Sequence, residues 1–135
     1  MEELVSMIKK EGGLKKQAPL LLEKVIESQK ELVKSGFVML PSEFVDFLRI
    51  YNGVRADACA ILGVEPEDAF LDIVSFNKLH NAAEDKVILG YDDFCFLVYD
   101  ASRECYLLLD REDGEELDDF SKDSLAYALS AILHF

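Results

Sequence analysis

The chain has 135 residues, half of them apolar and 30% charged, which is too hydrophobic for a disordered chain and too interrupted by charge for a membrane span. The 27 acidic and 14 basic residues give a formal net charge of −13, which opposes nucleic-acid binding and favours a basic protein partner or, more simply, solubility. This length and composition predict one globular domain, residues 1–135, with one hydrophobic core.

The acidity is concentrated in one part of the chain. Residues 1–36 contain seven lysines and six acids, whereas residues 84–119 contain thirteen acids and only three basic residues. The N-terminal segment places acids before a short apolar stripe, unlike a signal peptide, which needs a basic start and a continuous apolar stretch. We therefore expect a cytoplasmic protein that does not associate with membranes.

Two helices are predicted before residue 37. Residues 2–10 place a few apolar side chains on one helical face. After Pro19, apolar residues recur at spacings of three, four and seven and predict an amphipathic helix of roughly 16 to 18 residues that ends at Gly36. Its expected buried stripe consists of Leu21, Leu22, Val25, Ile26, Leu32 and Val33.

The segment LPSEFVDFLRIYNG, residues 40–53, has the pattern of a complete helix. Pro41 can open it, and Asn52-Gly53 tolerates a left-handed exit. The face expected to be buried carries Phe44, Phe47, Leu48 and Tyr51.

From residue 56 onward, the pattern changes to short apolar runs. ACAILGV (58–64) and AFLDIVSF (69–76) predict two strands joined by a polar turn, and residues 77–85 predict a short helix. KVILGYDD (86–93) then predicts a further strand.

Residues 94–110 predict a β-hairpin with its turn at Ser102-Arg103, so that Tyr99 faces Tyr106. This hairpin is apolar on both faces, so helices of this chain, a second subunit or a partner must cover the second face. The same register places Cys95 and Cys105 opposite acidic residues. The three cysteines, with Cys59, are therefore expected to be reduced.

The chain ends with a predicted short strand at residues 114–120 and a closing helix. We expect Ser121 to cap this helix and Asp123 to lie in its first turn. The predicted fold is α+β, with a mostly antiparallel four- to six-stranded sheet packed with helices, N-terminal helices and a closing C-terminal helix.

The segment DREDGEELDD, residues 110–119, contains seven carboxylates but does not fit a calcium loop. Gly114 is the fifth residue from Asp110, whereas an EF-hand loop needs glycine at the sixth position. Asp113-Gly114 instead predicts a reverse turn between two strands. His80, His134 and the scattered cysteines do not form a zinc-ligand pair. We therefore expect no metal and no cofactor.

Motifs for catalysis are missing from the sequence. It contains neither a Gly-x-Ser-x-Gly elbow nor a papain-like cysteine context, and EGG (11–13) precedes LKKQ rather than a phosphate-binding Gly-Lys-Ser/Thr. Carboxylates this densely mixed with turn residues usually point into water. The sequence therefore favours a non-catalytic protein.

LPSEFVDFLRIYNG resembles the helix of the SUKH superfamily, which includes bacterial immunity proteins and the fungal Smi/Knr-type regulator of cell wall assembly. The order of the later elements is also similar, and the resemblance extends from about Leu40 to the C-terminus. The chain lacks the tryptophan that is common around the family's central strands. The later segments that carry the resemblance are LDIVSFNKL, VILGYDDFCFLVYD, CYLLLDREDGEEL and LAYALSAIL.

This resemblance implies an α+β protein-binding domain without established catalytic residues, which in bacteria often neutralises a secreted toxin such as a nuclease or deaminase. Our leading hypothesis is an immunity protein that occludes a basic toxin. The alternatives are a regulatory scaffold similar to the fungal protein and a small ligand-binding protein or enzyme; a homodimer is also to be tested. Candidate anchors are Tyr51, Tyr91, Tyr99 and Tyr106. The candidate partner-binding residues are Asp92, Asp93, Asp110, Glu112, Asp113, Glu115, Glu116, Asp118 and Asp119.

Overall fold

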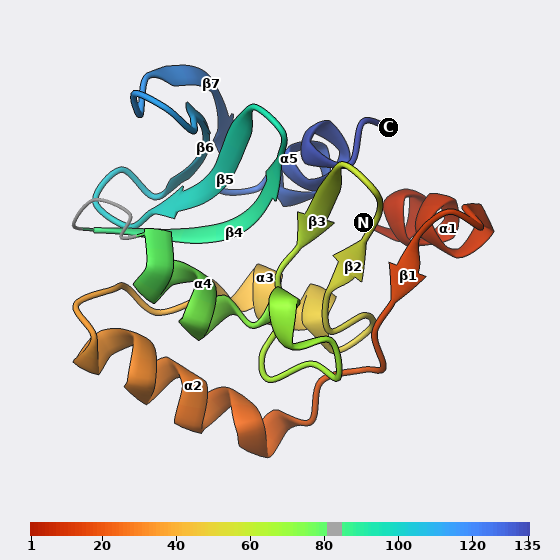
Figure 1. Ribbon diagram of the computed structural model, residues 1–135, viewed down its shortest axis with the longest axis horizontal. Helices are drawn as coiled ribbons and strands as arrows, with labels where there is room; N and C mark the ends of the chain where they lie inside the picture. The colour runs from red at the N-terminus through yellow and green to blue at the C-terminus, as the bar shows by residue number, and fades with distance from the viewer. Residues whose placement is uncertain (81–84) are drawn as a thin grey trace.

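The computed structural model describes residues 1–80 and 85–135, and its framework is a seven-stranded antiparallel sheet (Figure 1). The strands follow one another in space in chain order, so the sheet is a meander with helices inserted in its connections. The strands are β1 (Lys15–Lys16), β2 (Val54–Arg55), β3 (Cys59–Ile61), β4 (Lys86–Asp92), β5 (Cys95–Asp100), β6 (Cys105–Asp110) and β7 (Glu116–Ser121).

Helices surround this sheet. The closing helix α5 packs against strands β3 to β7, and α4 packs against β4 and α2. In Figure 1, α2 lies along the bottom of the molecule and β7 at its top. The described helices are α1 (Glu2–Lys10), α2 (Leu22–Lys34), α3 (Ser42–Leu48), α4 (Ile73–His80) and α5 (Leu125–Ile132), with a short 3₁₀ helix, η1 (Ala69–Leu71).

The predicted α+β class with an antiparallel sheet and a closing helix is confirmed, but the strand number of four to six is too low. The missed strands are β1 and β2, which have two residues each and pair with each other at Lys15 and Arg55. Two residues are too few to show a period of two in the sequence. The pairing joins the N-terminal segment to the main sheet.

The strand predicted at residues 69–76 is wrong, because this segment forms η1 and the first half of α4. The cause is local: Asp68 accepts a hydrogen bond from the backbone N–H of Phe70 at 3.1 Å, and Asp72 accepts bonds from the N–H and hydroxyl of Ser75. Carboxylates at these positions satisfy the unpaired N–H groups of a helix start. The helix expected at 77–85 therefore begins earlier, and its residues 81–84 lie outside the described residues.

Helix α2 is shorter than predicted because it begins at Leu22, after Pro19. Its end agrees with the sequence: Gly36 has a φ of 91°, and the N–H of Phe37 bonds to the carbonyl of Leu32 at 2.9 Å, the pattern of a Schellman motif. The predicted stripe is only partly buried. Val25 and Leu32 are inside, whereas four of its members are more than half exposed: Leu21, Leu22, Ile26 and Val33.

Helix α3 buries Phe44, Phe47 and Leu48 as predicted. It ends before Asn52, so Asn52-Gly53 is not the helix exit. Asn52 is instead buried, and its side-chain amide bonds to both the N–H and the carbonyl of Val64 at 2.8 Å. This residue therefore ties the segment after α3 to the segment after β3.

The predicted register of the β5–β6 hairpin is confirmed: Tyr99 pairs with Tyr106. Both faces are largely covered by the chain itself, since Leu97 and Val98, which point to opposite faces, are both fully buried. The expected start of α5 is wrong, because neither Ser121 as its cap nor Asp123 in its first turn agrees with the structure. Ser121 closes β7, and α5 begins only at Leu125, because a turn separates the two elements.

Candidate functional site

The acidic segment forms the turn between β6 and β7. The carboxylate of Asp110 accepts hydrogen bonds from the N–H groups of Glu112 and Asp113 at 2.7 and 3.2 Å, and Gly114 adopts a φ of 73°. The N–H of Asp110 also bonds to the carbonyl of Glu115. Asp110 therefore shapes the turn, as the prediction of a turn at Asp113-Gly114 requires.

The other carboxylates of this segment point into solvent. They lie on the turn and along β7, which is an edge strand and carries almost no buried side chain. We call this set the acidic rim: Glu112, Asp113, Glu115, Glu116, Asp118 and Asp119, all exposed. Among the described residues, Glu116 alone of the six forms an ion pair. The rim therefore carries a negative charge that neighbouring side chains leave largely uncompensated.

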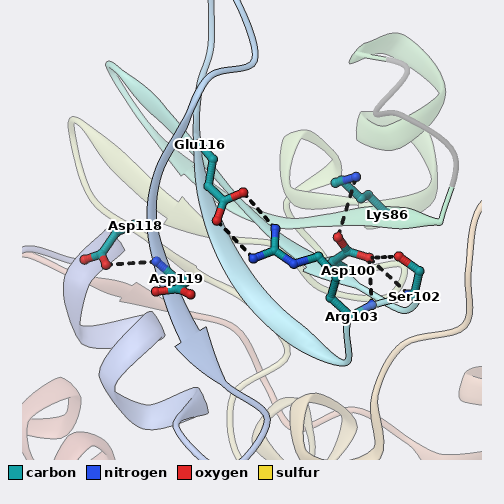
Figure 2. A network of polar contacts seen from close by, with 7 residues as sticks. All are labelled: Lys86, Asp100, Ser102, Arg103, Glu116, Asp118 and Asp119. Atoms are coloured by element: carbon teal, nitrogen blue, oxygen red, sulfur yellow. Dashed lines mark hydrogen bonds and ion pairs between the residues drawn. The ribbon is translucent and has the colours of Figure 1, made fainter.

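In the polar network of Figure 2, Glu116 and Asp100 are each bound by a nearby cation. Glu116 forms a bidentate ion pair with Arg103, with nitrogen–oxygen distances of 2.7 and 3.2 Å. The hydrogen bond from Arg103 lowers the pKa of Glu116. Burial alone would raise the pKa of Asp100, but bonds from Ser102 and from the N–H of Arg103, together with Lys86, lower it. Both groups are therefore ionised at neutral pH.

A hollow lies beside this network, on the sheet face that carries Phe96 and Leu109. It has a volume of about 560 Å³, and Val98 and Leu107 are part of its apolar floor. We call it the sheet hollow. Its walls contain three cationic and three carboxylate side chains, so its formal charge is balanced: Lys86, Arg103, Arg111, Asp100, Asp110 and Glu116. The hollow therefore has no net positive charge that would attract a phosphate or another anion.

Arg111 connects the hollow to an aromatic cluster. Its guanidinium lies 4.9 Å from the ring centroid of Phe96 and 5.5 Å from that of Tyr91, within the range of cation–π attraction. Tyr91 stacks on Phe76 of α4, and Phe76 also contacts His80. Burial, and then the charge of Arg111, lower the pKa of His80, so this histidine is neutral at physiological pH.

The two candidate residues of the β4–β5 turn, Asp92 and Asp93, have different environments. Asp92 is buried, accepts bonds from the N–H groups of Phe94 and Cys95, and contacts His134 at 3.0 Å. Asp93 is exposed. Asp92 therefore serves the structure of the turn, whereas Asp93 is available to a partner.

The structure brings the β4–β5 turn against the β6–β7 turn. Arg111 donates its backbone N–H to the carbonyl of Phe94 at 3.0 Å and its guanidinium to the carbonyl of Asp92 at 2.7 Å. The side chain of Phe94 is 75% exposed, although its backbone is held. The candidate residues predicted from the sequence do not include Phe94. Its position at a turn is the only sequence signal that could have indicated its exposure.

The tyrosines considered as anchors are less accessible. Tyr106 is fully buried, so it cannot contact a partner, and Tyr51, Tyr91 and Tyr99 are only partly exposed. Phe94 is more exposed than any of them, which makes it the better anchor.

The described residues contain little that resembles reactive chemistry. Burial, and nearby carboxylates, raise the pKa of the Cys59 and Cys95 thiols, and burial likewise raises the pKa of Cys105, so all three stay protonated at neutral pH. Within residues 1–80 and 85–135, no group of three or more histidine, cysteine or acidic residues is arranged to hold a metal ion. Over the same residues, no helix is both long and apolar enough to cross a membrane.

Comparison with known proteins does not identify a relative: no protein-family model matches the chain, and no curated protein matches it significantly.

Proposed function

We propose that this protein is a non-catalytic protein-binding domain that recognises a basic protein surface through the acidic rim, and that it acts as an immunity protein that neutralises a toxin by occlusion. The observation that carries this proposal is the uncompensated exposed charge of the rim. Five of its six carboxylates have no ion-pair partner among the described residues, although the chain places other carboxylates within reach of a lysine or arginine.

The rim would act first on the rate of association. Clustered carboxylates attract a basic surface over roughly a Debye length, about 8 Å at physiological ionic strength. Affinity needs desolvated apolar contacts as well. Phe94 supplies an exposed aromatic ring beside the rim, and its backbone is fixed by the bond from Arg111, so little backbone conformational entropy is lost when it binds.

The proposed mechanism is occlusion and needs no chemical step by this protein. The active sites of nucleases and of nucleic-acid deaminases are basic because their substrates are polyanions. A rigid acidic turn can cover such a site and compete with the substrate. The resemblance to the SUKH superfamily supports the same type of function, and the scaffold role known in its fungal branch is the rival reading.

The experiment is co-expression with the product of the neighbouring gene, followed by co-purification and a cell-survival assay. We expect a complex and protection of the cells. The variant Glu112→Lys/Glu115→Lys/Asp118→Lys should lose both, and Phe94→Ala should weaken binding without changing its salt dependence. Glu112, Glu115 and Asp118 are chosen because their side chains do not accept the bonds that shape the turn.

The matched control, Glu2→Lys/Glu11→Lys/Glu67→Lys, has the same net charge but changes exposed acids elsewhere. If this control weakened binding as much as the rim variant, total charge rather than the rim would be responsible. A complex that forms without protecting the cells would favour the scaffold role.

A further inference from the structure

Helix α2 exposes an apolar face that the described part of the chain does not cover. Leu22, Ile26 and Val33 are 58%, 60% and 52% exposed, and Met39, from the segment after the helix, is 57% exposed beside them. Ile26, Val33 and Met39 line one open groove. The residues at the alternate positions, Val25 and Leu32, are buried in the core. The helix is thus apolar on two adjacent faces, and one of them packs against nothing in the part of the chain that the structure describes.

The exposed residues have the spacing of a helix-pairing seam. Leu22, Ile26, Gln29 and Val33 follow one another at intervals of four, three and four, the alternation of the d and a positions of a heptad. Gln29 does not interrupt this seam, because its side-chain amide already bonds to both the N–H and the carbonyl of Leu40 at 2.7 and 3.2 Å. Its polar atoms therefore do not require water.

Two charged residues flank the seam and form no ion pair within residues 1–80 and 85–135. Glu23 and Lys30 both occupy the e position and have no ion-pair partner among the described residues. The adjacent Lys24 and Glu31 do, since Lys24 lies 3.7 Å from Glu65 and Glu31 lies 2.6 Å from Lys78. Glu27 and Lys34 of α2 likewise form no ion pair among the described residues, but they lie at b positions, so Glu23 and Lys30 are the unpaired charges next to the seam.

This pattern is self-complementary. If two α2 helices lie antiparallel, with Leu22 against Val33 of the other copy, then Ile26 lies against Gln29. Residues at e positions meet each other across an antiparallel pair, so Glu23 lies beside the Lys30 of the other copy. The two-fold axis repeats this contact, which gives two opposite-charge pairs.

We propose that α2 is the homodimerisation surface of this protein, through an antiparallel α2–α2 pair. An acidic partner could pair with Lys30 but would place its own negative charge beside Glu23. A second copy of this chain offers an opposite charge to both residues. Long-range charge also favours this arrangement, because residues 1–36 are nearly neutral and β7, which carries part of the acidic rim, lies on the opposite side of the molecule from α2 (Figure 1). The dimer keeps the two rims apart and free.

The first test is the molar mass of the purified protein, measured by light scattering and sedimentation velocity from low micromolar to near-millimolar concentration. A concentration-dependent dimer is expected. Ile26→Asp should yield a monomer, and Leu117→Asp, which adds the same charge at an exposed apolar residue of β7, should leave the dimer intact. A wild-type protein that is monomeric throughout, or an Ile26→Asp variant that still dimerises, would overturn the proposal.

The second test exchanges the flanking charges. Glu23→Lys and Lys30→Glu each convert both ion pairs into like-charge contacts and should weaken the dimer by about tenfold. The double variant should recover the wild-type dissociation constant, and a mixture of the two single variants should form the heterodimer preferentially. Absence of both recoveries would overturn the antiparallel pairing. Glu23 and Lys30 are exposed, and far-ultraviolet circular dichroism checks that the variants remain folded.

Discussion

In two regions of this protein, side chains form hydrogen bonds to backbone groups, but these bonds have different roles. At the buried junction around Asn52, Gly63 and Asn77, side-chain amides bond to backbone groups of distant segments. At the acidic end, the carboxylates of Asp110 and Asp113 bond to backbone N–H groups two or three residues ahead. The hydrogen bonds of the two regions have similar lengths, but those at the junction are shielded from water and those at the turns of the acidic end are not.

This difference determines where sequence changes can be tolerated. A buried backbone group that loses its partner remains unsatisfied, whereas an exposed one bonds to water instead. The junction is therefore expected to determine stability, and the acidic end is free to serve a partner. The four predictions below test this division, beginning with the largest effect.

Asn77→Ala should be the most destabilising change. Asn77 is fully buried, and its amide bonds to the carbonyl of Ile73 and to both the N–H and the carbonyl of Ile88. Its loss leaves buried groups of β4 unsatisfied and should cost about 4 kcal/mol of unfolding free energy in urea titration. Leu79→Ala, at a residue of α4 that is 78% exposed, is the control and should cost far less. Equal losses in the two variants would contradict a special role of the junction.

Gly63→Ala should be the second most destabilising change, with a loss of about 3 kcal/mol of unfolding free energy in urea titration. A Cβ atom at Gly63 would overlap the backbone carbonyl of Asn52, and this clash cannot be relieved by rotating a side chain. Gly12 has open space around it, so Gly12→Ala is a matched control that should be nearly neutral. A stable Gly63→Ala variant would show that the junction is less tightly packed than described.

Asp100→Asn should have an intermediate, pH-dependent effect of about 2 kcal/mol near neutral pH, because Asp100 is buried and its charge is bound by Ser102, the N–H of Arg103 and Lys86. Its pKa is lower in the folded than in the unfolded state. The contribution is therefore complete above the unfolded value of about 4 and is lost as the pH falls through the folded pKa. The difference between wild type and variant should shrink in acid.

Asp57→Asn changes an exposed acid and controls for the charge change in the Asp100 experiment. A cost of Asp100→Asn that stayed constant down to strong acid would rule out a charge-dependent contribution.

Arg103→Gln should have the smallest effect on stability. Arg103 and Glu116 are each nearly half exposed, and water replaces their interaction at little cost. The thermal midpoint should stay within experimental error of the wild-type value at low and at high salt. A loss comparable to that of Asp100→Asn would place the acidic end among the elements that hold the fold together.

The sequence predicted the parts of this fold that depend on local pattern. The β5–β6 register followed from alternation and turn chemistry, and the Schellman end of α2 followed from Gly36. The turn at Asp113-Gly114 followed from a dipeptide with strong conformational preferences. These features form within a few residues of one another, so neighbouring residues contain the necessary information.

The wrong predictions arose where two local signals compete. The segment 69–76 is an apolar run of strand-like length, but Asp68 and Asp72 cap helical turns within it. Periodicity alone cannot separate a short buried strand from a short buried helix, and the capping residues decided the outcome. Asp92 shows a similar limit, because a carboxylate that closes a turn and one that meets a partner look alike in sequence.

The amino-acid sequence by itself determined the class of the fold, the hairpin, the turn of the acidic segment and the concentration of negative charge, because these depend on residues close together in the chain. Tertiary structure alone decided which apolar face of α2 is covered, that Asp92 is buried while Asp93 is exposed, and that Arg111 holds Phe94 in place. Exposure and contact depend on which distant segments meet, and a periodic pattern shows that a face is apolar without showing what covers it.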